Sequence, residues 1–271
     1  MVVKPPCDGS SVGISKVSKE EEWKSALADA FKAQLRGFGV DIGHMATGGD
    51  RMGIYVVDYE DGQPGDLASS SIRAQNVLYT FDGDSYRWSS PTTIYWRDKQ
   101  TPVSIYGYYP FDAELQSTQD YPFTVQKNQR DNMKTGRQLT GYEQSDFLWA
   151  KQEKVVPTAA TVSLKHHHLM AGIKVVLTEG QGFLEGEWDN IDKTVLVENT
   201  ILDATINLQA GTVATQGSTT GVITPLPTAG GTGGGTAFRA VVVTQTVAAG
   251  KTLLTLTIDN KTYRFTRSEA M

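Results

Sequence analysis

Three consecutive histidines, His166 to His168, have the clearest potential for chemistry in this 271-residue sequence, and His44 is the only other histidine. Imidazole is a common zinc ligand, and on a strand His166 and His168 would point to one face, where they could share a metal ion. A zinc site needs a further ligand, which no spacing in the sequence identifies. We therefore favour the alternative interpretation, in which the imidazoles begin a strand and are hydrogen-bonded between two domains, and we predict no metal site.

Acidic side chains that could bind calcium lie in two predicted turns. One turn contains Asp82 and Asp84, and the other runs from Asp58 to Asp66. Neither has the ligand spacing of a calcium-binding loop, and acidic residues at such places usually form turns. A carboxylate pair for glycoside hydrolysis cannot be identified either, because a chain of this composition contains many such pairs.

Two glycine-containing stretches match known motifs only in part. Residues 9–13 fit the pattern G-x-S-x-G, but that serine is a nucleophile only at a strand-to-helix turn, and here it lies in a polar tail. Residues 227–236 lack the glycine spacing of a phosphate-binding loop, and we expect a flexible loop there. We predict no catalytic residue and no cofactor, and a domain without such a site is more often a binding or structural module than an enzyme.

The composition indicates a globular protein. Hydrophobic residues make up 39% of the chain and charged residues 20%, which excludes a disordered protein. The formal charge of −5 gives no attraction to nucleic acid, and no apolar run is long enough for a membrane-spanning helix.

The N-terminal residues MVVKPPCDGSS lack the apolar core of a signal peptide, so the protein is either cytosolic or begins after processing. The single cysteine, Cys7, excludes an internal disulfide and a cysteine-based zinc site. Lys4, Pro5 and Pro6 do not resemble the small and apolar residues that precede a lipidated cysteine. We therefore expect Cys7 to be a free thiol in a loose tail.

Residues 18–37 have the pattern of a helix. Ser18 and Glu21 have the spacing of a capping box, and Gly37 can end the helix. Apolar residues follow at steps of four, namely Trp23, Leu27, Phe31 and Leu35. A helix that binds a partner would have this pattern, but a surface helix packed on its own domain is more common, and we expect the latter.

The chain after Gly37 alternates mostly with the period of β-strands. Asp82–Gly83–Asp84 and Asp259–Asn260 are expected to be hairpin turns. A change of apolar face in residues 162–177 predicts one strand with a bulge or bend beside Gly172. Many short strands and almost no helix predict an all-β protein of antiparallel sheets closed into sandwiches.

A domain boundary is expected in the polar segment 151–161, which contains a proline. The chain then divides into residues 1–155 and residues 156–271. Five of the sixteen residues from Trp96 to Phe111 are aromatic, and we expect these rings to form the packed centre of the first sandwich.

An ordered set of strand segments resembles the fimbrillin-like proteins of the Bacteroides group, which are subunits of type V surface pili and related lipoproteins. In that family a Trp strand leads to a Tyr-Trp strand and then to an aromatic-Tyr-Pro signature. The matching segments are YRW (86–88), IYWRD (94–98), VSIYGYYPF (103–111), SDFLWA (145–150), VSLKHHHLMAGIKVVL (162–177), ATINLQAGTV (204–213) and FRAVVVTQTVAAGKTLLTLTI (238–258). The resemblance implies two antiparallel Greek-key (transthyretin-like) β-sandwich domains, and it aligns His168 with a structural histidine.

The resemblance also implies a function. It implies a structural and adhesive component of a cell-surface fimbria, namely a pilus subunit, tip adhesin or anchor, exported to the cell surface or outer membrane. Its partners would be other pilus subunits, joined by donor-strand exchange, and host or bacterial surface glycans or proteins. Proteolysis after an arginine is implied to open the acceptor groove, and Arg36 is our candidate for that position.

The competing hypothesis is a glycan-binding surface lipoprotein of the same fold, with Trp96 or Trp149 as a sugar platform. Exposure discriminates the two, because a platform faces solvent and a structural ring is buried. An enzyme is the least supported class, because no catalytic constellation is found. Relatives usually continue beyond the segment that matches Tyr263 and Phe265 into a further strand, so we expect an unpaired sheet edge here.

Overall fold

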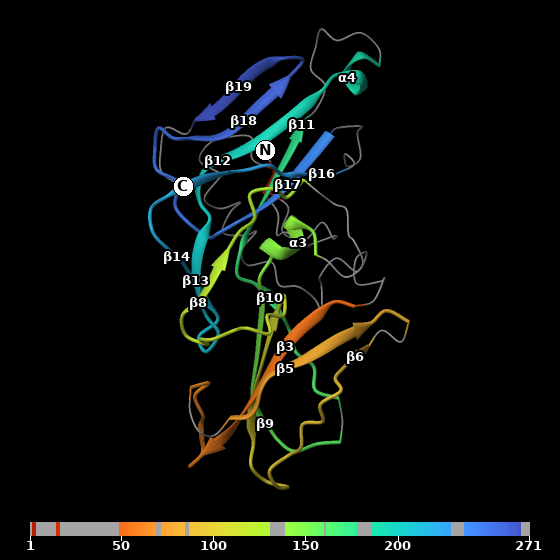
Figure 1. Cartoon of the computed structure of the whole chain (residues 1–271), viewed down its shortest axis with the longest axis vertical. Coiled ribbons are helices and arrows are strands. Elements are labelled where there is room, and N and C mark those ends of the chain that lie inside the picture. The colour runs from red at the N-terminus through yellow and green to blue at the C-terminus, as the bar shows by residue number, and fades with distance from the viewer. Residues whose placement is uncertain are drawn as a thin grey trace.

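The structure is a computed structural model that describes residues 2–3, 15–16, 49–68, 72–84, 87–130, 139–159, 161–177, 186–228 and 236–266. Cys7, Arg36 and the predicted helix over residues 18–37 lie outside the described residues. The molecule is elongated, with one large sheet at its lower end and further sheets above it (Figure 1). No helix in the described ranges is long and apolar enough to cross a membrane.

Sheet I is the large sheet, and its strands are all antiparallel. In spatial order they are β10 (His167–His168), β9 (Leu148–Val155), β7 (Val103–Tyr109), β3 (Arg51–Glu60), β5 (Ile72–Asp82) and β6 (Arg87–Ser89), with β4 (Gln63–Pro64) paired to β3. Side chains on both faces of its central strands are buried. Tyr55 and Tyr106 contribute to one hydrophobic cluster, whereas Ile54 and Val103 contribute to a second cluster on the opposite face.

Sheets II and III form a β-sandwich in the upper part of the molecule. Sheet II contains β16 (Leu226–Thr228), β17 (Thr236–Val242), β11 (Ala171–Leu177), β1 (Val2–Val3) and β2 (Ser15–Lys16) in that order. Sheet III contains β15 (Thr220–Ile223), β12 (Lys193–Ile201), β18 (Thr252–Ile258) and β19 (Lys261–Thr266). Val175 and Phe238 of sheet II and Val197 of sheet III belong to one buried cluster, so these sheets share a core. A short helix, α4 (Glu187–Asn190), precedes β12.

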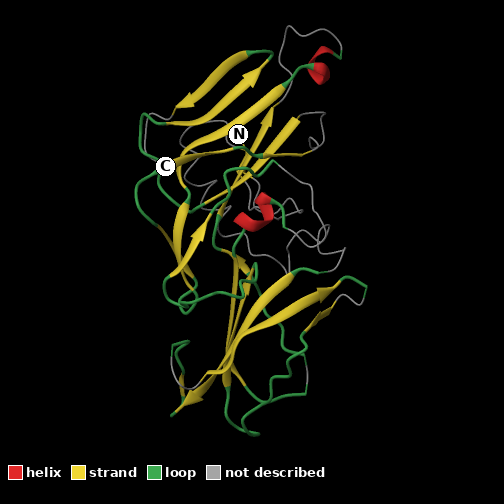
Figure 2. Cartoon of the chain, in the orientation of Figure 1, coloured by secondary structure: helices red, strands yellow, loops and turns green. Residues whose placement is uncertain are grey.

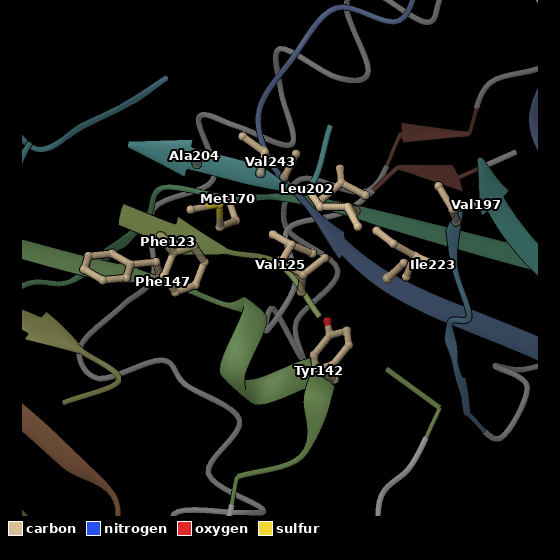
Figure 3. Close-up of a cluster of buried hydrophobic side chains, with 14 of the residues drawn as sticks. Phe123, Val125, Tyr142, Phe147, Met170, Val197, Leu202, Ala204, Ile223 and Val243 are labelled. Carbon is tan, nitrogen blue, oxygen red and sulfur yellow. The ribbon is translucent and has the colours of Figure 1, made fainter. Parts of the chain in front are cut away.

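Sheet IV joins segments that are far apart in the sequence. Its strands are β14 (Thr212–Thr215), β13 (Asp203–Asn207) and β8 (Tyr121–Thr124). Phe123 and Phe147 pack edge to face, with ring centroids 5.3 Å apart, in the same cluster as Met170 and Leu202 (Figure 3). The cluster is thus continuous across the expected division between residues 155 and 156, and that division stays a prediction.

Two glutamine side chains replace missing strand neighbours. The side-chain amide of Gln129 donates to the Val241 carbonyl and accepts from the Val241 N–H, both at 2.8 Å. Gln245 does the same for Ile201, donating at 2.8 Å and accepting at 2.7 Å. In each case one side-chain amide bonds to both main-chain groups of one residue, on the side where no strand of the described residues pairs with it.

The aromatic segment is largely buried, as expected. Tyr106, Tyr108 and Tyr109 are each at most 3% exposed. The Tyr108 ring stacks on Phe147 at 5.9 Å, and its hydroxyl accepts a hydrogen bond from the Asp112 N–H at 3.2 Å. Burial of large rings whose polar tips still find partners explains why a soluble chain can concentrate aromatic residues here.

The all-β class with antiparallel sheets is confirmed, and both predicted hairpins form. β5 pairs with β6 around Asp82–Gly83–Asp84, and β18 pairs with β19 around Asp259 and Asn260, which have φ values of 46° and 60°. These left-handed conformations suit a two-residue hairpin turn.

The expectation of one bent strand over residues 162–177 is wrong. The segment divides between β10 of sheet I and β11 of sheet II, with Leu169 and Met170 between them. The change of apolar face therefore marks a crossover between two sheets, and Gly172 lies inside β11.

Candidate functional site

The three histidines lie in different environments. His166 is 1% exposed, and its burial lowers its pKa to about 4. Burial also lowers the pKa of the half-buried His167, to which the charge of Lys165 adds. His168 Nδ1 lies 2.6 Å from Asp146 Oδ1, and both side chains are buried.

In the described part of the chain, no three His, Cys, Asp or Glu side chains are grouped so that they could hold a metal ion. His168 instead links β10 to the end of helix α3 (Gly141–Ser145), whose C-cap is Asp146. His168 therefore makes a structural contact, and the absence of a metal site at the three histidines stays a prediction.

The acidic turn residues have structural partners. Asp58 is buried and forms a bidentate contact with Arg73, one bond of which joins Nε to Oδ1 at 2.7 Å. Asp82 accepts a hydrogen bond from the main-chain N–H of Asp84, and Asp66 accepts one from that of Ala68. These contacts are typical of carboxylates that shape turns.

Both candidate platform tryptophans are half-buried. The Trp96 indole donates to the Thr158 carbonyl at 3.1 Å, and its ring packs on the second cluster. The Trp149 indole donates to the Leu208 carbonyl at 2.7 Å, and its ring leaves no room for a side chain at Gly211. Each indole therefore forms a hydrogen bond with a segment that is distant in the sequence. A role in ligand binding stays a prediction for both tryptophans.

The outer edge of sheet III carries two exposed aromatic side chains. All six residues of β19 are exposed, and within the described part of the chain β19 is the last strand of its sheet (Figure 2). Its aromatic side chains, Tyr263 and Phe265, are 53% and 37% exposed. We call β19 with these two rings the edge surface.

The edge surface continues the face that forms the core. Phe265 pairs across the strands with Leu254, which pairs with Val197, and side chains of directly paired residues lie on one face of a sheet. Leu254 is 3% exposed and Val197 is completely buried. The cover over this face therefore decreases toward β19, which leaves an apolar shelf beside a strand edge that no strand of the described residues pairs with.

The sequence-based expectation of an unpaired edge near Tyr263 and Phe265 stays a prediction, and other features were missed. Nothing in the sequence indicated that Gln129 and Gln245 bond to main-chain groups, because these hydrogen bonds depend on where distant strands end in the folded chain. Tyr95, whose side chain is 75% exposed, was also missed as a solvent-facing ring beside Trp96. Arg36, the candidate processing site, lies outside the described residues.

Comparisons with known proteins agree with the β-rich architecture. The sequence profile described as fimbrillin-like matches residues 41–271. A candidate cell adhesion protein from Bacteroides uniformis has a similar structure, with a TM-score of 0.57, 19% sequence identity and 82% of each chain covered. Another from Bacteroides ovatus has a TM-score of 0.56 and 14% identity, with 82% of this chain and 78% of that chain covered. Among curated proteins no match was found.

Proposed function

Because the chain belongs to the fimbrillin-like family, we propose that it is a structural and adhesive component of a cell-surface fimbria, as a pilus subunit, tip adhesin or anchor. Its partners are other pilus subunits, and assembly proceeds by donor-strand exchange at the cell surface. The two parts of the chain, residues 1–155 and 156–271, are Greek-key sandwich domains in this proposal. Cleavage after Arg36 prepares the subunit for assembly.

The observation that carries the proposal of strand exchange is the edge surface. An added strand can form main-chain hydrogen bonds along β19 while its alternate side chains cover the rings of Tyr263 and Phe265. Lys261 and Arg264 are the only charged residues of β19, and both are basic, so acidic side chains in the added strand would complement them.

An added strand suits this surface better than a flat apolar contact. With about 200 Å² for each fully exposed ring, the exposed fractions leave about 180 Å² for a partner to cover, which is worth about 4 kcal/mol. Association alone costs at least about 4 kcal/mol, so the rings by themselves would not hold a partner. The main-chain hydrogen bonds of an added strand supply the remaining attraction and the register.

Assembly of variants tests this proposal. Purified protein is treated with an arginine-specific protease, and filaments are counted by electron microscopy, with ladders examined on gels of unboiled samples. We expect Tyr263→Lys and Phe265→Lys to abolish assembly, because a lysine cannot be covered on the apolar shelf. Thr262→Lys is the matched control, because Thr262 lies on the opposite face of the same strand, and it should assemble normally.

Two outcomes would change the proposal. Normal assembly of both ring variants would exclude the edge surface as the acceptor. A wild-type protein that stays monomeric under every condition would exclude a stalk subunit and leave the tip, the anchor or the glycan-binding lipoprotein.

The second candidate function is glycan binding, which the exposure of Tyr95 favours. An exposed ring can stack on a sugar, and Trp96 lies next to it in the chain. Binding to an array of surface glycans should then decrease strongly in Tyr95→Ala and remain in Tyr263→Ala. Equal binding by both variants would exclude this platform.

A further inference from the structure

The crossover between sheets I and II is short. β10 contains two residues, which pair with Leu148 and Trp149 of β9. Beyond it the Leu169 N–H donates to the Phe147 carbonyl at 2.9 Å, and the chain then enters β11 of sheet II.

His166 precedes β10 and packs closely on β7. A Cβ atom at Gly107 would lie 2.9 Å from His166 Nε2 and 3.2 Å from Leu164 Cδ1. The segment from Leu164 to His166 can therefore lie against β7 only because residue 107 is glycine. The ring is thereby placed in an environment from which water is excluded.

His168 fixes the other end of the crossover. Its Nδ1 atom lies 2.6 Å from Asp146 Oδ1, and the side chains are 6% and 4% exposed. This contact joins β10 to the C-terminal end of α3.

Several groups act on the charge of His166. Burial disfavours the protonated ring most strongly, and the charges of His167 and His168 add to this effect, whereas a hydrogen bond with the Leu164 main chain opposes it. Lys165, which precedes His166 in the chain, is a further charged residue of the segment. On the face of sheet I where His166 packs, Tyr109 donates a hydrogen bond to Asp50 at 3.4 Å.

We propose that residues 164–168 are an acid-sensitive latch, in which His166 leaves its place beside Gly107 and β10 separates from β9 before the rest of the protein unfolds. The contact between His168 and Asp146 remains, so the segment turns about this residue. Opening of the latch uncovers the apolar face that Leu164 covers, and β9 becomes the edge strand of sheet I.

Hydrogen exchange followed by mass spectrometry tests the latch on the intact protein at pH 7 and pH 5. If His166 titrates normally in the open state, the population of that state should be about 20-fold higher at pH 5 than at pH 7. The measured exchange rates are first corrected for the intrinsic effect of pH on amide exchange. We expect this increase in peptides that cover residues 161–169 and 147–150. Peptides that cover β12 and β18 should show no comparable change.

Variants make the test specific to one ring. His166→Gln and His166→Met cannot titrate, so the difference between pH 7 and pH 5 should vanish in whichever of them folds, while His167→Gln should keep it. The proposal is overturned if the wild-type peptides near β10 change no more than those of β12. It is also overturned if a folded His166 variant keeps the full effect of pH, or if neither variant folds and the wild-type His166 resonance titrates at the normal pKa.

Discussion

Replacement of Gln129 tests how much its side-chain amide, which bonds to main-chain groups as a neighbouring strand would, contributes to the unfolding free energy. Gln129 is completely buried, and its amide is bonded to both main-chain groups of Val241. Gln129→Met keeps the shape but leaves a buried N–H and a buried carbonyl without these bonds. At about 1 to 3 kcal/mol for each unsatisfied group, the variant should lose about 2 to 6 kcal/mol of unfolding free energy.

Gln245→Met is the matched control, because Gln245 forms the same pair of bonds with Ile201 but is only half-buried. Water can replace the lost amide there, so we expect a loss of about 1 kcal/mol. Urea unfolding followed by tryptophan fluorescence measures both values by linear extrapolation. Equal losses in the two variants, or a neutral Gln129→Met, would refute the reasoning that burial makes this amide indispensable.

Three further predictions concern the packing of sheet I. Gly107→Ala should lower the unfolding free energy by about 1 to 3 kcal/mol through a clash with His166, and His166→Ala in the same chain should restore part of it in a double-mutant cycle. Trp149→Phe should cost about 1 kcal/mol in urea unfolding, because the bond to Leu208 is lost, and an unchanged midpoint would contradict this. Acid should destabilise the protein: the folded state holds the pKa of His166 near 4, so the unfolded state binds more protons below pH 6.5. The unfolding free energy should then fall by about 3 kcal/mol between pH 6.5 and pH 4, and His166→Gln should remove this part of the slope.

The sequence predicted those features that depend on local pattern. Alternation and turn residues indicated an all-β fold and the hairpins at Asp82–Asp84 and Asp259–Asn260, because these signals act over a few residues. The aromatic segment was correctly expected to be buried, because exposing many large aromatic rings to water is unfavourable.

Features that depend on distant partners could not be predicted. Alternation within residues 162–177 does not reveal that β10 and β11 belong to different sheets. The pairing of β8 with β13 joins residues about 80 positions apart, and neither strand carries a sign of its partner. Gln129 likewise bonds to Val241, a distant residue that comes near it only when the chain is folded.

Protection of β19 in assembled filaments would decide whether the edge surface joins subunits. Amide exchange of residues 261–266 is compared between the monomer and filaments formed after treatment with an arginine-specific protease. Strand addition predicts that these amides become strongly protected in the filament, while the exposed turn at Asp259 and Asn260 changes little. Filaments in which β19 exchanges as fast as in the monomer would contradict assembly at this edge.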